Sequence, residues 1–322
     1  MPTILITGAS GFVGRSTAKK FRDRGWTVFG VGRRETEQPN YLRADLSAPL
    51  DRQIIDAIAA SDIVLHAAAR SSPWGSRRTF DRANVLATRR LLETCESHGR
   101  PRFLFVSSSS VYYREQDQLD LNEGSPLAAR PVNHYAASKQ RAEAEVHGYG
   151  GPSLIIRPRA VYGRGDTVLF PRILAAARAG KLPLLIRDGE PAIGDLISID
   201  NLTERFWQVA QHDSLAGSLN LTDNDPQPII PFLLDVFRRL ELPTPTRKVP
   251  VWRAYRFAHA IEILYGALLP WSEPPITRFG VHVFAYSKTF DVTKMIQELG
   301  PPLQTTETAV SEFVDWIRRQ ES

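Results

Sequence analysis

The sequence has a single cysteine, Cys95, among its 322 residues. One cysteine excludes an intramolecular disulfide framework and a zinc site built from several thiolates, so we expect no metal site. No cysteine pattern indicates an oxidising compartment, and no basic leader precedes an apolar run at the N-terminus, so we expect a cytoplasmic protein. Cys95 falls in a helix-patterned segment, where we expect a small buried hydrophobic residue.

The sequence also lacks blocks of one charge sign and long repeats. Its 40 Lys and Arg residues exceed its 35 Asp and Glu residues by five, and the excess is spread along the chain. This pattern predicts a solvated surface and no nucleic-acid partner. With 43% hydrophobic and 23% charged residues, the composition excludes wholesale disorder, a collagen-like fibre and a polytopic membrane protein.

Short apolar runs alternate with helix-patterned segments in the first half. This rhythm is typical of an α/β protein with a doubly wound parallel Rossmann sheet covered on both faces. We expect strands at 4–7, 28–31, 63–66, 103–107 and 154–157, and helices at about 12–24, 51–59 and 80–97.

After Pro158 the rhythm breaks and prolines become frequent. We expect a smaller, discontinuous α+β substrate domain there. Residues 1–157 and about 192–222 would form the dinucleotide-binding domain, and about 158–191 and 223–322 the substrate domain. Within these, 219–222 is expected as a strand, and 195–202 as a strand that runs into a helix capped by Asp200 or Asn201.

The stretch 249–271 is apolar and aromatic, with four polar interruptions at Arg253, Arg256, His259 and Glu262. These interruptions argue against a bilayer span. The favoured interpretation is a helix that lines a substrate pocket. The alternative is an interfacial helix in peripheral contact with a membrane.

Three glycines, Gly8, Gly11 and Gly14, follow the first predicted strand and open the first predicted helix. Glycine permits a tight exit from the strand, close approach of a pyrophosphate and close packing of helix on sheet. The free N–H groups of the helix would face the phosphates. The loop therefore predicts dinucleotide binding, with Ser10, Phe12 and Val13 as further contacts.

The end of the second strand indicates which dinucleotide binds. Arg33 and Arg34 stand where an acid would accept from the ribose of NAD, and two guanidiniums suit a 2′-phosphate. The sequence therefore favours NADP, with NAD as the alternative and two surface charges as the structural explanation. Asp45 and Leu46 are expected near the adenine, although Asp45 could instead cap a helix. The small residues Ala67, Ala68 and Ala69 would let the cofactor cross the strand ends, or simply pack well.

Tyr135 and Lys139 are four residues apart and share one face of a predicted helix. A nearby ammonium favours the phenolate and brings its pKa closer to neutrality. Ser107 and Ser108 end the fifth-strand segment, where a hydroxyl can bind a reacting oxygen. Asn84 would organise a contact near Lys139, or else be a helix-surface amide.

These motifs together resemble the extended short-chain dehydrogenases/reductases. The matching segments are TGASGFVG (7–14), HAAA (66–69), SSSSVY (107–112), YAASK (135–139) and RPRAVYGRGD (157–166). The resemblance implies a Rossmann domain with a small substrate domain, and a Ser108, Tyr135 and Lys139 triad. It also places Pro158 and Val161 beside the cofactor, and implies a homodimer formed through helices at about 80–98 and 134–148.

The branch of the family is indicated by departures from its sugar-nucleotide members. Ala160 and Gly194 stand where those members often carry an asparagine and an arginine for the diphosphate, and Ser109 and Ser110 replace a dehydratase-type acid pair. The segment 273–300 resembles 3β-hydroxysteroid dehydrogenase-like members. We therefore expect an NAD(P)-dependent oxidoreductase that interconverts a secondary alcohol and a ketone on an apolar steroid-, flavonoid- or β-keto-acyl-like substrate. The alternatives are a nucleotide-sugar epimerase/dehydratase and a non-catalytic NADP-sensing protein.

Overall fold

Seven parallel strands form the central sheet of the computed structural model, which describes residues 1–269 and 271–321. Their order is β12-β7-β5-β4-β1-β2-β3. The bounds are β1 (Thr3–Thr7), β2 (Thr27–Gly32), β3 (Tyr41–Arg43), β4 (Ile63–His66), β5 (Arg102–Val106), β7 (Ser153–Pro158) and β12 (Gly217–Leu221). The strands expected from the apolar runs are confirmed, with ends that differ by one or two residues.

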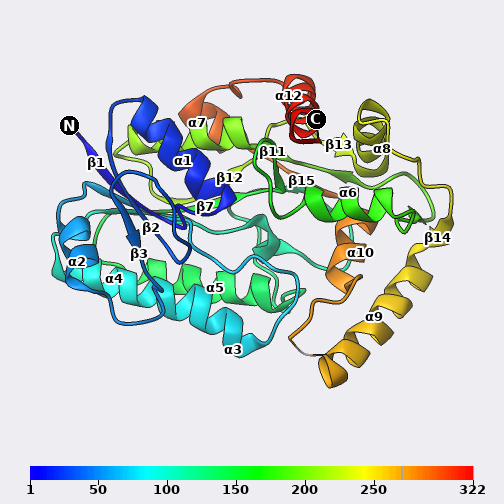
Figure 1. The fold of residues 1–322 in the computed structure, drawn as a ribbon, viewed down its shortest axis with the longest axis horizontal. Coiled ribbons are helices and arrows are strands. Elements are labelled where there is room, and N and C mark those ends of the chain that lie inside the picture. The colour runs from blue at the N-terminus through cyan, green and yellow to red at the C-terminus, as the bar shows by residue number, and fades with distance from the viewer. Residues whose placement is uncertain (270, 322) are drawn as a thin grey trace.

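Helices cover both faces of this sheet (Figure 1). Ile4 and Ile6 point to one face and Leu5 to the other, because side chains alternate along a strand. The first face packs on α1 (Phe12–Asp23), α7 (Ile199–Ala210) and α11 (Thr293–Leu299), and the second on α2 (Arg52–Ala59), α4 (Ala87–Ser97) and α5 (His134–His147). The doubly wound architecture is thereby confirmed, and Cys95 is fully buried in the second layer, as expected.

A second sheet has the order β13-β10-β15-β6. Its strands are β13 (Gln227–Pro228), β10 (Ile193–Gly194), β15 (Lys288–Phe290) and β6 (Gln118–Leu121), so one strand comes from the first half of the chain. Two short parallel pairs join β8 (Val161–Tyr162) to β11 (Ile197–Ser198) and β9 (Leu184–Ile186) to β14 (Lys248–Pro250). A separate apolar cluster around Phe170, Phe237 and Phe313 unites α6 (Phe170–Arg178), α8 (Ile229–Arg239) and α12 (Thr306–Glu321).

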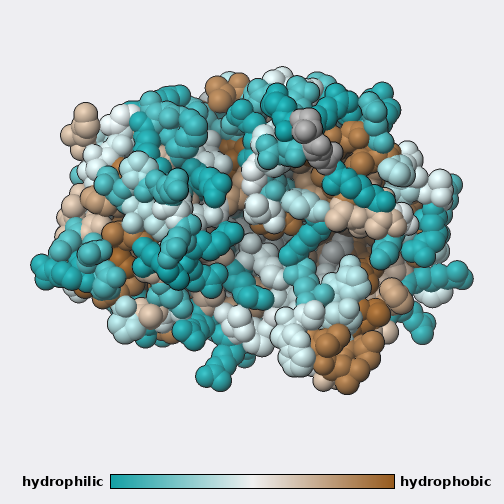
Figure 2. Space-filling model, in the orientation of Figure 1, coloured by the Kyte–Doolittle hydropathy of each residue, from teal (hydrophilic) through white to brown (hydrophobic). Residues whose placement is uncertain are grey.

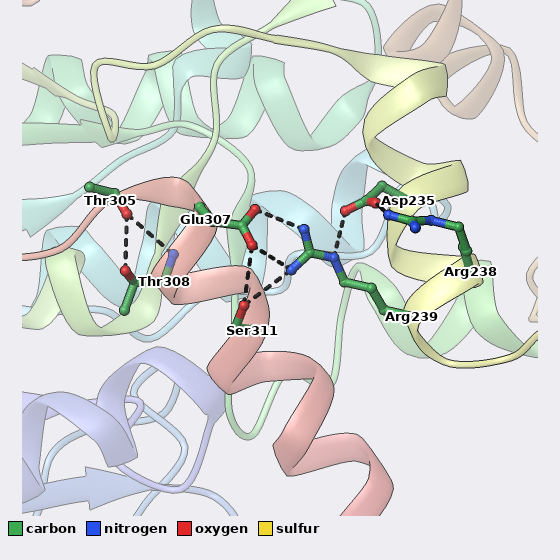
Figure 3. Close-up of polar contacts among 7 residues, drawn as sticks. All are labelled: Asp235, Arg238, Arg239, Thr305, Glu307, Thr308 and Ser311. Carbon is green, nitrogen blue, oxygen red and sulfur yellow. Dashed lines mark hydrogen bonds and ion pairs between the residues drawn. The ribbon is translucent and has the colours of Figure 1, made fainter.

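An ion-pair network joins α8 to α12 at their ends (Figure 3). Arg239 donates to both carboxylate oxygens of Glu307, at 2.7 and 2.8 Å, and also pairs with Asp235 at 2.7 Å. A guanidinium fork matches a carboxylate in this way. The network fixes how α12 lies against α8, within the apolar cluster that the two helices share with α6.

The expected cap of α7 is wrong. The hydroxyl of Ser198 accepts from the Asn201 N–H at 3.2 Å, so Ser198 is the N-cap, and Asp200 lies in the first turn. The strand β11 ends at Ser198, sooner than the apolar pattern suggested, because Asp223 binds the Ser198 N–H and the Asn201 side chain. Because of these bonds the helix is capped at Ser198, two residues before Asp200 and three before Asn201.

The long helix α9 (Val251–Leu268) lies at the rim of the molecule (Figure 1). Only Ala254 and Ala258 of this helix are buried, and they pack against Val281 and Ala285 of α10 (Arg278–Ala285). Glu262 binds the Arg278 side chain at 2.6 Å and ties the two helices together. None of the helices described is both long enough and apolar enough to cross a membrane.

The strand order places β1 between β2 and β4, so the chain winds away from β1 in both directions. Parallel sheets bind ligands outside the carboxyl ends of the strands at such a switch point. Thr7, Gly32, His66, Val106 and Pro158 all end strands of this sheet. The residues that follow them therefore meet at one crevice.

Candidate active site

A cavity of about 780 Å³ opens at this edge of the central sheet. It contains every residue predicted for the site except Asn84. The lining includes Gly8, Ser10, Gly11, Phe12, Val13, Gly14, Arg33, Arg34, Asp45, Leu46, Ala67, Ala68, Ala69, Ser107, Ser108, Tyr135, Lys139, Pro158 and Val161. Residues as far apart in sequence as Gly8 and Val161 are brought together because parallel strands end side by side.

The glycine loop has the geometry that a pyrophosphate cradle needs. Gly8 adopts a φ of +72°, and a Cβ there would lie 2.9 Å from the Ala68 backbone. A Cβ on Gly14 would lie 2.2 Å from the Gly8 carbonyl oxygen, so only glycine allows α1 to start against the loop. The N-cap Gly11 has no capping side chain, and the first turn of α1 contains no acidic residue. The backbone N–H groups are thus left for an anion, and the loop fits a dinucleotide.

At the end of β2, Arg33 and Arg34 are exposed and line the cavity. Their carbonyls accept hydrogen bonds from Arg43 and Tyr41, while the guanidinium of Arg43 pairs with Glu35. Glu35, the acid next to the two arginines, is therefore already paired with Arg43. The guanidiniums of Arg33 and Arg34 remain at the rim of the cavity, where they could meet a phosphate.

Asp45 lies in the same part of the cavity and binds the backbone and hydroxyl of Ser47, at 2.9 and 2.7 Å. The Ser47 hydroxyl lowers the pKa of the Asp45 carboxyl, and Arg82 and Arg33 lower it further. The capping residue of α2 is Asp51, whose side chain accepts from Ile54 N–H, so the helix-capping explanation of Asp45 is wrong.

Tyr135 stands in the first turn of α5, which Asn133 caps by accepting from the Ala136 N–H at 2.8 Å. Its phenol lies within hydrogen-bonding reach of the Ser108 side chain, two residues beyond the end of β5. Burial raises the pKa of Tyr135, the Ser108 bond lowers it, and the neighbouring Tyr113 raises it. The residues at 108 and 135 thus meet as the resemblance implied.

Lys139 lies one turn further along α5 and is 2% exposed. Its Nζ donates to the Val106 carbonyl at 2.7 Å and lies 4.6 Å from the centre of the Phe105 ring. Burial lowers the pKa of Lys139 to about 7, and Glu143 acts in the opposite direction. Burial, Ser108 and Tyr113 are the influences that shift the pKa of the Tyr135 phenol, and the tuning that we expected from the Lys139 ammonium stays a prediction.

Asn84 and Ser107 bind other residues of the protein. Asn84 lies in a π-helical turn (Asp81–Leu86) and is buried, so it is not a surface amide. Its amide bonds to Ser138 Oγ, next to Lys139, at 2.8 Å and to the backbone of Arg70, and it therefore fixes the loop after β4 against α5. The Ser107 hydroxyl binds the buried Glu143.

The far end of the cavity is largely apolar. Its wall comes from α6, α8 and α10, through Phe170, Ile173, Phe232, Leu233, Phe279, Val283 and Phe284. The expectation that the 249–271 helix lines the pocket is wrong. None of the described residues of α9 reaches the cavity, because α10 lies between them and presents its own apolar face.

Sequence reasoning missed several polar residues of this cavity, among them Ser110, Tyr113, Arg159 and Asp195. Arg159 and Ser110 were part of quoted motifs, but nothing in their spacing indicates that they face a ligand. The helical spacing of Phe279, Val283 and Phe284 indicates an apolar face. The spacing does not indicate that this face lines the cavity.

Comparisons with known proteins agree with this geometry. A model of the NAD dependent epimerase/dehydratase family matches residues 4–221. A 2-alkyl-3-oxoalkanoate reductase of Stenotrophomonas maltophilia is 30% identical over 294 residues, covering 86% of this chain and 87% of that protein. The sterol-4-alpha-carboxylate 3-dehydrogenase (decarboxylating) of Mus musculus is 26% identical over 325 residues, covering 96% and 89%.

Among solved structures, MoeE5 in complex with UDP-glucose and NAD is similar in fold, with a TM-score of 0.76. It is 22% identical and the match covers 99% of this chain and 100% of that chain. The family model spans more than half of the chain, and the relatives cover it almost from end to end. The chain therefore belongs to the NAD-dependent epimerase/dehydratase family and is an enzyme of the extended short-chain dehydrogenase/reductase type.

Proposed function

We propose that this enzyme interconverts a ketone and a secondary alcohol on an apolar substrate, with NADP as the preferred cofactor. One observation carries the proposal: the Ser108 and Tyr135 side chains lie together in a cavity that has a glycine cradle at one end and an apolar wall at the other. The cradle and the wall supply separate places for a dinucleotide and for a lipophilic carbonyl compound. The relatives named above act on oxoalkanoates and sterol carboxylates, according to their names.

The nicotinamide, when bound, supplies the hydride that a carbonyl carbon receives in the reducing direction. Tyr135 donates its phenolic proton to the carbonyl oxygen, which gives a secondary alcohol. Ser108 donates its one hydroxyl hydrogen bond to the same oxygen. Lys139 would hold the nicotinamide ribose from its position above the Val106 carbonyl.

The nucleotide-sugar alternative has less support from the cavity. Gly194 faces it with no side chain, and a Cβ there would lie 3.3 Å from Ile229 and 3.4 Å from Arg159. An arginine for a sugar diphosphate would need that space. The apolar side chains of α6, α8 and α10 offer few partners to sugar hydroxyls.

Replacing Tyr135 with Phe is expected to lower kcat by about 10²–10⁴-fold, because the proton donor is lost while the ring keeps its packing. The dissociation constant of NADPH should hardly change. Steady-state kinetics and fluorescence titration of NADPH measure the two effects. Tyr149→Phe is the matched control, since the Tyr149 hydroxyl binds the Pro101 carbonyl outside the cavity, just beyond the end of α5. Wild-type turnover in Tyr135→Phe would contradict the proposal.

We further propose that Arg33 and Arg34 bind the 2′-phosphate of NADP. The double variant Arg33→Ala, Arg34→Ala should raise the dissociation constant of NADPH about tenfold or more, since charge-assisted hydrogen bonds contribute about 1.5–3 kcal/mol. The affinity for NADH, which has no such phosphate, should stay within about twofold, and Arg52→Ala, which removes an exposed arginine of α2 outside the cavity, should affect neither cofactor. Equal losses of affinity for NADPH and for NADH would show that Arg33 and Arg34 do not bind the 2′-phosphate.

We also propose that α9 makes peripheral contact with a membrane. Trp252, Phe257 and Leu268 are each more than half exposed, and Figure 2 shows apolar surface gathered over the end of this helix. Arg253 and Arg256 are exposed beside them, while the one acid of α9, Glu262, is paired with Arg278. An apolar face with an excess of positive charge suits anionic lipid headgroups.

The wild-type protein should co-sediment with vesicles that contain anionic lipid, and less so at high salt, because the arginine contribution is screened. A Trp252→Ser, Leu268→Ser double variant should remain in the supernatant. Leu303→Ser, which removes a side chain that is 60% exposed but lies outside α9, should behave like wild type. Wild-type protein that stays in solution at low salt, or that dimerises through α9 without vesicles, would contradict the membrane assignment.

A further inference from the structure

Arg159 places a cation inside the substrate end of the cavity. It directly follows β7, and its backbone N–H donates to the Leu221 carbonyl at 3.1 Å, which fixes the residue against β12. The residue is 5% exposed and lines the cavity. The guanidinium is therefore removed from bulk water and held where a substrate would bind.

This guanidinium has no ionic or hydrogen-bonding partner in the described ranges 1–269 and 271–321, and its Nε is a buried donor without an acceptor. Other buried arginines are satisfied. Arg157 pairs with Glu143 at 2.7 Å, and Arg102 donates to the carbonyls of Val209 and Leu215 at 2.7 and 2.9 Å. An unpaired buried charge is costly, so Arg159 is an exception that the folded chain alone does not explain.

Asp195 acts electrostatically on Arg159, but among the described residues the two form no ion pair. Asp195 Oδ2 accepts from the Phe290 N–H at 2.8 Å, and burial raises the pKa of the Asp195 carboxyl to about 6, although Arg159 lowers it. A second cation, Lys288, lies close by: Arg159 Cζ and Lys288 Nζ are 5.2 and 5.7 Å from the centre of the Tyr113 ring. The local charge balance therefore favours an added anion.

A neutral donor lines the same cavity. The hydroxyl of Ser110 is buried and has no hydrogen-bond partner among the described residues, whereas Ser109 bonds to the Tyr113 hydroxyl at 3.1 Å. Arg159 and Ser110 are thus two unsatisfied donors in one site. A carboxylate has enough lone pairs to accept from both, and its planar shape matches a guanidinium.

We infer that Arg159 binds a carboxylate of the substrate, so that the substrate is a 3-oxo or 3-hydroxy carboxylic acid with an apolar tail. This inference rests on the proposed function. Tyr113 lies beside Arg159 and acts on the Tyr135 phenol, and all three residues line the same cavity, so one substrate can meet both the guanidinium and the phenol. Both relatives carry the same arrangement in their names, a carboxylate on the carbon next to the one that is reduced or oxidised.

The test compares a medium-chain 3-hydroxyalkanoate with its methyl ester, both oxidised with NADP, which avoids the unstable 3-oxo acids. For wild type, kcat/KM should be about 100-fold higher for the acid than for the ester, because a hydrogen-bonded charge contributes about 1.5–3 kcal/mol. In Arg159→Gln this ratio should fall towards one. In Arg159→Lys it should lie between the two values, since an ammonium lacks the fork. A wild-type ratio near one, or a ratio that Arg159→Gln leaves unchanged, would overturn the inference.

Two further measurements separate this inference from the proposed function and from a structural role. Calorimetric binding of the acid to the NADP complex needs no turnover: acid-selective binding that Arg159→Gln abolishes upholds the inference even where no oxidation occurs, and its absence overturns it. Without ligand, Arg159→Gln should melt no lower than wild type, because it removes an unpaired buried charge. Arg157→Gln, which leaves the buried Glu143 carboxylate without its ion-pair partner, should melt at a lower temperature than wild type. A lower melting temperature for Arg159→Gln would instead assign it a structural role.

Discussion

The pairing of the Ser108 and Tyr135 side chains is the contact on which the whole site depends. Each partner is fixed by a different element, Ser108 by the end of β5 and Tyr135 by the capped first turn of α5. Lys139 ties the same helix to the same strand through the Val106 carbonyl. The packing of α5 on the sheet therefore sets the position of the phenol relative to the cofactor cradle, and few side chains need to move for chemistry.

Two buried arginines at the end of β7, Arg157 and Arg159, have different roles. Arg157 is enclosed with Glu143, and Glu143 also accepts from Ser107, so this group is satisfied by the protein and holds α5, β5 and β7 together. Arg159, two residues later, points into the cavity and is left unpaired. A protein tolerates an unsatisfied buried cation where a ligand completes it, and this contrast separates structural arginines from one that recognises substrate.

Much of the fold and the cofactor end could be predicted because their signals are local. The glycine loop, the alternating apolar runs and the Tyr135–Lys139 spacing each lie within a short segment. The apolar runs form the central sheet, and the glycine loop, Tyr135 and Lys139 line the cavity. The cap of α7 and the wall of the substrate end were missed because they depend on packing between distant segments. Asp223 turns the chain at Ser198, and α10 separates α9 from the cavity. The homodimer, the domain boundaries and the cytoplasmic location stay predictions.

The most direct test of the account is the pH dependence of kcat for alcohol oxidation in wild type and in Ser108→Ala. In this direction Tyr135 must be a phenolate, so activity is lost as the pH falls below the pKa of its phenol. Since the Ser108 bond lowers that pKa, its removal should move this limb of the profile to higher pH, whatever the loss in maximal rate. A limb that stays at the same pH would show that Tyr135 is not the group that titrates, and would contradict the central claim.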